Sequence, residues 1–264
     1  MPAFSAKDVQ KLRQMTGVGM LDAKNALDET EGDLDKAVTR LREKGLASQA
    51  KRADRDASEG AVAIGRSGAA ASIVQLRSET DFVAKSDEFV ALVSSLADLV
   101  AEQGEDAIAS RSDEIDNLKI TLKENISVGR VVRIEAPSGG VVDTYLHLQA
   151  GRGVNAVVVA LDGGTEQLAH DIAAHIAFAR PSFITREDVP EDEVAAERET
   201  VEKIARNEGK PDAQLPKIVE GRLNGWYKER VLLDQPYVKD EKQTIAKLLG
   251  PAKVTQFAQV VVGD

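Results

Sequence analysis

Apolar residues recur three and four positions apart in the first part of the chain, which is the spacing of amphipathic helices. Three such stripes follow one another, separated by the glycine-bearing segment 16–19 and by Gly32, with a predicted end at Gly45. The pattern therefore predicts a domain of three short helices over residues 1–47. Residues 48–59 are polar and charged without a hydrophobic period, so we expect a linker there, helical in part.

From residue 60 the spacing changes to that of strands. Residues 60–78 predict two strands around a glycine-rich turn, and residues 82–100 predict one helix. A further helix is predicted from a shared apolar face, made of Ile115, Leu118, Leu122 and Ile126. We expect residues 60–135 to form a first core subdomain, in which a small antiparallel sheet is backed by helices.

The same order of elements occurs a second time. Residues 139–149 and 153–164 predict a second hairpin, and residues 165–179 predict the helix that follows it. The end of the chain predicts a short helix and a returning strand that complete this second sheet. We therefore expect a second, related core subdomain formed by residues 136–189 and 229–264.

Residues 190–228 interrupt the second subdomain with a charged segment that carries two apolar stripes. The stripes consist of Val194, Val201 and Ile204 in the first half and of Leu215, Ile218, Val219, Leu223 and Trp226 in the second. The sequence "NEGKP" lies between them and is typical of a turn, so the segment predicts an inserted antiparallel helical hairpin of the coiled-coil type. Together with the three-helix domain and the two sheet subdomains, this makes the predicted fold class α+β.

Composition limits the chemistry that the chain can perform. Its 264 residues carry a formal net charge of −10 and include no cysteine. The acidic balance argues against direct binding of nucleic acid or of an anionic membrane, because phosphate contacts need clustered Lys and Arg. The lack of cysteine excludes disulfides and cysteine-bound zinc and fits a reducing compartment. With neither a leader peptide nor a membrane-length apolar run, we expect a bacterial cytoplasmic protein.

Two segments imitate nucleotide-binding motifs but continue in the wrong secondary structure. "GAVAIGRS" has the spacing of a phosphate-binding loop, but Arg66 replaces the required lysine and a strand follows. "GRGVNA" at residues 151–156 also precedes a strand, whereas the dinucleotide fingerprint must open a helix. The histidines match no metal-ligand spacing, since His170 and His175 lie five residues apart. We therefore predict no cofactor, no metal site, no catalytic residues and no enzymatic activity.

The periodicity leaves two apolar residues undecided between the core and the surface. Met20 follows a glycine-bearing segment that permits a tight loop, so it either forms an apolar tip or packs the helical core. Phe82 lies at the junction of a predicted strand and a predicted helix. It precedes Phe89 by seven residues, so it either extends the buried stripe of that helix or points outward.

Four ordered and separate stretches carry a resemblance to a known family. They are "LRQMTGVGMLDAKNAL" at residues 12–27, "ETDFVAKSDEF" at 79–89, "IVEGRLNGWYKE" at 218–229 and "LLDQPYVKD" at 232–240. The four stretches are spread along nearly the whole chain, and through them the sequence resembles translation elongation factor Ts. The resemblance implies a ubiquitin-associated-like fold for the first domain. It also implies a guanine-nucleotide exchange factor that binds elongation factor Tu, GDP-bound or nucleotide-free, and promotes GDP release during translation elongation.

The resemblance also implies roles for particular residues. A group that presses on the magnesium and phosphate site of the partner consists of Thr80, Asp81, Phe82 and Val83. Contacts from the N-terminal domain are implied for Leu12, Gly17, Val18, Gly19, Met20 and Lys24. Contacts from the second core subdomain are implied for Tyr145, His147, Gly151 and Arg152, although the three residues after them depart from the commoner family spacing. The resemblance favours an exposed Phe82, with Asp81 fixing the local turn, and leaves open a homodimer in the complex.

Two functions of other classes remain as alternatives. A general interaction adaptor would bind through the three-helix domain alone, and the core subdomains would be dispensable. A hydrolase that uses Asp and His would show turnover on its own, which no motif in the sequence supports.

Overall fold

The computed structural model describes residues 4–50, 52 and 54–264. Its N-terminal part consists of α1 (Ala6–Thr16), α2 (Met20–Glu29) and α3 (Leu34–Ala50). Ser5 and Asp8 cap α1 reciprocally, and Gly17 ends the helix in the left-handed conformation with φ of 68°. The three helices enclose a small core that includes Leu12, Leu27 and Ala37.

The prediction that Gly45 ends the third helix is wrong, because α3 continues to Ala50 and so crosses the predicted domain boundary. The glycine serves a close packing contact instead. A Cβ atom added at Gly45 would lie 2.6 Å from Cγ1 of Ile120 in α6 (Ser112–Leu122). The missing side chain therefore lets α3 approach the first core subdomain at a distance at which alanine would displace Ile120.

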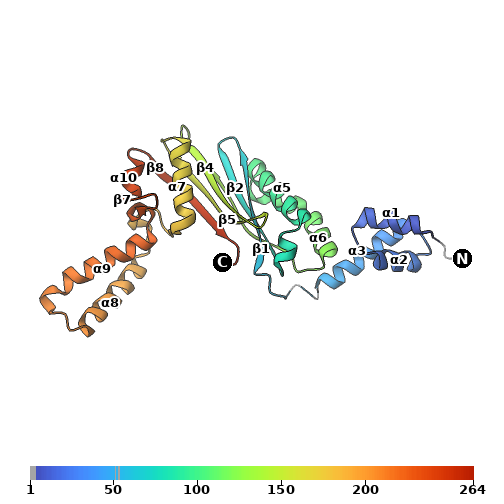
Figure 1. Cartoon of the computed structure of the whole chain (residues 1–264), viewed down its shortest axis with the longest axis horizontal. Helices are drawn as coiled ribbons and strands as arrows, with labels where there is room; N and C mark the ends of the chain where they lie inside the picture. Colours follow the sequence, from blue (N-terminus) through green and yellow to red (C-terminus); the bar gives the residue numbers. More distant parts are fainter. Residues whose placement is uncertain (1–3, 51, 53) are drawn as a thin grey trace.

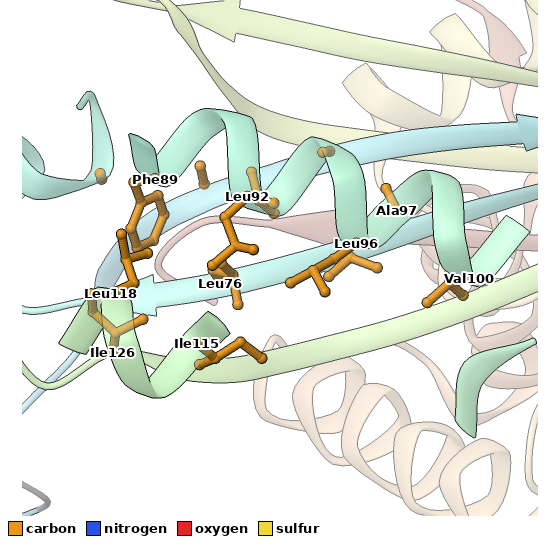
Figure 2. Close-up of a cluster of buried hydrophobic side chains, with 14 residues drawn as sticks. Leu76, Phe89, Leu92, Leu96, Ala97, Val100, Ile115, Leu118 and Ile126 are labelled. Carbon is orange, nitrogen blue, oxygen red and sulfur yellow. The ribbon is translucent and has the colours of Figure 1, made fainter. Parts of the chain in front are cut away.

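The first core subdomain contains an antiparallel sheet of three strands in the order β1-β2-β3. The strands are β1 (Glu59–Ser67), β2 (Ala70–Ser78) and β3 (Ser127–Glu135). The hairpin of β1 and β2 was predicted, whereas β3 was not. One face of the sheet is covered by α5 (Asp87–Gln103) and α6, joined by the 3-10 helix η1 (Glu105–Arg111). Figure 2 shows the resulting core, in which Phe89, Leu92 and Leu96 of α5 lie over the strands.

Two details of this subdomain correct the sequence-based prediction. The single helix expected over residues 82–100 is divided into α4 (Asp81–Ala84) and α5, and Ser86 caps the second helix by accepting a hydrogen bond from the Phe89 amide at 3.4 Å. Ile126 lies beyond the end of α6, although it belongs to the same buried cluster. The apolar spacing thus identified buried residues correctly but joined elements that the chain separates.

The second core subdomain repeats the plan, as predicted. Its antiparallel sheet has the order β4-β5-β8. The strands are β4 (Val141–Gln149), β5 (Arg152–Asp162) and β8 (Lys253–Val261), and the covering helices are α7 (Glu166–Ala179) and α10 (Ile245–Leu249). Smaller elements are η2 (Arg186–Asp188), η4 (Leu232–Asp234) and a separate two-stranded sheet of β6 (Pro236–Tyr237) and β7 (Asp240–Thr244). The returning strand β8 completes this sheet beside β5, as the sequence predicts.

The two sheets pack against each other through a third apolar cluster, which includes Val62 and Ile73 from the first sheet and Val158 and Val260 from the second. Figure 1 shows α5 and α7 on opposite sides of the paired sheets. The core therefore has four layers, with helices outside and two sheets inside, and the structure confirms the predicted α+β class. No helix of the described residues combines the length and apolarity needed to cross a bilayer.

A helical hairpin extends from the second subdomain, well apart from the sheets in Figure 1. It consists of α8 (Glu191–Asn207), the 3-10 helix η3 (Asp212–Gln214) and α9 (Leu215–Arg230). Its buried contact is made by Val201 on α8 with Val219 and Leu223 on α9. Ile204, which was expected in this contact, is 44% exposed, because Ala205 occupies the inner position one residue further on.

Candidate partner-binding site

The feature that stands out at the surface is the corner between β2 and α5, residues 79–86, which contains α4. Thr80 is the N-cap of α4, and its hydroxyl oxygen accepts a hydrogen bond from the Val83 amide at 3.4 Å. Asp81 was expected to fix the turn, but its carboxylate pairs with Lys85 one turn later, at 2.5 Å. The cap therefore comes from Thr80, and Asp81 adds an i,i+4 ion pair to the outer side of the helix.

Glu124, which no sequence pattern indicated, completes this corner. Its Oε2 accepts hydrogen bonds from the backbone amides of Glu79 at 3.0 Å and Thr80 at 3.1 Å. The hydroxyl of Thr80 donates to Oε1 of the same carboxylate at 2.5 Å. The contact joins residues 44 positions apart in the sequence, so local spacing carried no signal for it.

Phe82 is 83% exposed, which confirms the prediction that it points outward. Its neighbours point inward, since Ala84 is buried and Val83 packs against the core cluster below α5. The break between α4 and α5 explains the difference, because it removes Phe82 from the seven-residue register with Phe89. The corner thus exposes one aromatic ring to solvent, while the backbone amides of Thr80 and Val83, before and after Phe82, are hydrogen-bonded.

The charge beside Phe82 is held in its ionised form. The hydrogen bond from Lys85 lowers the pKa of Asp81, and the charges of Lys85 and Arg152 act in the same direction. A carboxylate whose pKa lies below its ordinary value stays negative throughout the neutral range.

The second-core residues divide into structural and exposed ones. Arg152 is only 7% exposed, and its guanidinium donates to the Gly60 carbonyl at 2.5 Å and to Glu59 Oε2 at 2.8 Å. Its side chain therefore joins the two sheets and is not free to reach a partner. Gly151 lies in the exposed turn with φ of 83°, and His147 is exposed on β4.

Tyr145 is half-buried, and its ring lies 6.5 Å from that of His170 on α7. Its packing against the second core leaves only part of the side chain accessible. Leu148, which was not predicted as a site residue, is 63% exposed next to His147. The accessible surface of this end of β4 is thus apolar in part, with an imidazole beside it.

The N-terminal residues divide in the same way. Leu12 and Val18 are buried in the three-helix core, so their side chains support the domain and offer no surface for contact. Gly17 and Gly19 are exposed, and Met20 is 64% exposed, which decides between the two interpretations of Met20 in favour of the apolar tip. Met20 and Lys24 line a surface groove together with Val9.

A further apolar surface was missed by the sequence analysis. Phe178 on α7 is 78% exposed, and together with the half-exposed Val238 it lines a surface pocket. The signal was present in the sequence, because Phe178 falls outside the stripe that buries Ile172 and Ile176.

Two histidines have side-chain partners of different kinds, since His170 on α7 lies 3.6 Å from the Asp143 carboxylate, whereas His175 contacts Gln235. Among residues 4–50, 52 and 54–264, no three His, Asp or Glu side chains gather so that they could hold a metal ion. His175 is buried, accepts a hydrogen bond from the Val238 amide at 3.4 Å and contacts Gln235 Oε1 at 2.9 Å. Burial lowers the pKa of His175, so this imidazole is neutral and serves as a packing element.

Comparison with known proteins identifies the family. Residues 79–264 match the family model described as elongation factor TS. The chain is 46% identical to elongation factor Ts of Kineococcus radiotolerans over 277 residues, 44% identical to that of Clavibacter michiganensis over 282 residues and 45% identical to that of Mycobacterium marinum over 281 residues. Each alignment covers the whole of both chains. The protein belongs to the elongation factor Ts family.

Proposed function

We propose that this protein is the guanine-nucleotide exchange factor of a bacterial elongation factor Tu and acts in the cytoplasm during translation elongation. It binds the GDP-bound partner, weakens the magnesium and phosphate site and promotes release of GDP. Family membership supports the choice of partner. The exposed aromatic ring of Phe82 on a hydrogen-bonded corner is the observation that carries the mechanism.

The mechanism needs no covalent step. A GTPase holds GDP through backbone amides, a lysine and a Mg²⁺ ion that bridges to the phosphates. Phe82 inserts its ring beside the elements that position this ion, and burial of a phenylalanine side chain supplies about 2 kcal/mol for their displacement. The coupling is reciprocal, so GDP weakens the binding of this protein to elongation factor Tu by the same factor.

Other surfaces supply the docking area around Phe82. We assign this role to the N-terminal tip with Met20 and Lys24, and to the exposed end of β4 with His147 and Leu148. The pocket beside Phe178 offers a further apolar contact. Leu12, Val18 and Arg152 act only through the fold, because their side chains are buried.

We keep the division into a three-helix domain, two core subdomains and a hairpin as part of this proposal. The first boundary moves to residue 50, where α3 ends. The hairpin of α8 and α9 projects away from the sheets, and a second copy of the chain in the complex remains a prediction that sedimentation of the complex would test.

The release of a fluorescent GDP analogue from elongation factor Tu tests the proposal. The protein should accelerate release in a saturable manner when Mg²⁺ is present. Excess EDTA should greatly reduce the acceleration, because removal of the ion accomplishes the same step without the protein. Equal acceleration with and without Mg²⁺ would contradict the magnesium mechanism, and no acceleration would contradict the proposed function.

A further inference from the structure

The loop between α6 and β3 reaches back to the corner that presents Phe82. The amide of Asn125 donates to Glu79 Oε1 at 2.7 Å, and Glu124 accepts three hydrogen bonds from Glu79 and Thr80. The loop is therefore hydrogen-bonded to the two residues that immediately precede α4. Nothing in the apolar pattern of the sequence required this contact.

The hydrogen bonds of Thr80 form a chain with a defined direction. A hydroxyl group has one proton to donate and two lone pairs to accept with. Because the Thr80 proton is directed to Glu124, a lone pair of the same oxygen is available for the Val83 amide, which donates to it. Glu124 thus orients the cap of α4 through Thr80.

Phe82 depends on this arrangement because α4 has only four residues. A helix of one turn has no stability of its own in water and persists only where caps and packing hold it. On the inner side the packing comes from Val83 and Ala84. At the N-terminal end of the helix, the carboxylate of Glu124 accepts hydrogen bonds from the amide and the hydroxyl of Thr80.

We propose that Glu124 is a positioning residue that holds Phe82 in the orientation needed for nucleotide exchange. This inference rests on the proposed function. Glu124 acts through Thr80 and the backbone, at the base of the corner.

The first test uses the isolated protein, so it does not depend on elongation factor Tu. Hydrogen exchange at the amides of residues 79, 80 and 83 is measured by NMR for the wild type and the variants Glu124→Ala, Glu124→Gln and Glu114→Ala. Loss of a charged acceptor should speed exchange at these amides by about tenfold or more in Glu124→Ala. Glu124→Gln, which keeps one carbonyl oxygen for the amides, should lie between it and the wild type. Glu114 is a surface residue of α6 that pairs with Arg111, so its removal should leave these amides unchanged.

The second test measures release of the fluorescent GDP analogue from elongation factor Tu. Glu124→Ala should lower the maximal release rate by about tenfold, the same factor as above, with a half-saturating concentration close to that of the wild type. Glu124→Gln should recover part of the rate. In a Phe82→Ala background, Glu124→Ala should cause no further loss, because both changes act through one ring.

The outcomes separate this inference from the function on which it rests. A wild-type protein that does not accelerate release refutes the proposed function itself. Normal wild-type activity together with unchanged amide exchange in Glu124→Ala, or with losses that multiply in the double variant, refutes the positioning role alone. If Glu124→Ala does not fold, Glu124→Gln supplies the same two comparisons.

Discussion

Two phenylalanines seven residues apart offer a sharp test of how the corner works. Phe82 is 83% exposed, whereas Phe89 is fully buried in the core below α5. Replacing Phe89 with Ala should lower the free energy of unfolding by about 3–5 kcal/mol, the range for a buried phenylalanine. Replacing Phe82 with Ala should change it by less than about 1 kcal/mol, because the ring makes little contact within the chain.

The same Phe82→Ala variant should be strongly impaired in exchange. Truncation of an aromatic hot spot in an interface costs about 2 kcal/mol or more. Each 1.4 kcal/mol on a barrier is about tenfold in rate, so we expect the maximal rate of GDP release to fall by about tenfold or more. The affinity for elongation factor Tu should fall less, since docking also uses other surfaces. Phe82→Leu keeps apolar bulk without the ring, so its maximal release rate should lie between those of the wild type and Phe82→Ala.

Urea unfolding followed by circular dichroism measures the stabilities, and stopped-flow fluorescence measures GDP release. The reasoning is refuted if Phe82→Ala loses several kcal/mol of stability while its folded fraction exchanges nucleotide normally. That result would place Phe82 in the core. A stable Phe82→Ala variant with a wild-type release rate would instead show that exchange uses another part of the surface.

Three further predictions follow from the packing and the buried imidazole. Removal of residues 1–50 should leave a core that folds cooperatively and binds elongation factor Tu more weakly, and titration calorimetry measures this affinity. An unchanged affinity would contradict a docking role for the three-helix domain. Gly45→Ala should destabilise the protein because the added Cβ meets Ile120. Gly221 lies in open space on α9, so Gly221→Ala should stabilise the protein by about 0.5–1 kcal/mol. Thermal melts of the two variants measure both effects. Burial lowers the pKa of His175 below its ordinary value of 6.5, so the unfolded state binds more protons and stability should fall as the pH drops below that value. His175→Gln should flatten this dependence in urea titrations.

Hydrophobic spacing was sufficient for most of the elements. The stripes of the three N-terminal helices, the β1–β2 and β4–β5 hairpins and the helical hairpin all follow from periods of 3.6 and 2, which depend on neighbours along the chain. Composition and motif spacing likewise argued against a phosphate-binding loop at Arg66, and the structure places that residue in β1. These features are local, so the sequence alone determined them.

The remaining features depend on residues that are distant in sequence. Gly45 has the local signature of a helix end, and only the approach of Ile120 shows that it serves packing. Arg152 has the signature of a surface charge, and only the pairing of the two sheets buries it against Gly60. Periodicity left Phe82 undecided because its seven-residue offset from Phe89 would extend the buried stripe only if one helix ran through both residues, and only the structure shows the break between α4 and α5.

The corner itself shows why tertiary structure was needed. Thr80 is a recognisable cap residue, but the acceptor that orients its hydroxyl comes from Glu124, which follows α4, α5 and α6 in the sequence. A polar contact of this kind leaves no period in the chain, because a single hydrogen bond constrains only one pair of positions. The sequence by itself therefore determined which segments fold and that an aromatic residue lies at their junction. Only the tertiary contact of Glu124, in the loop between α6 and β3, with residues 79 and 80 and the break between α4 and α5 decided that this ring is held outward on a fixed base.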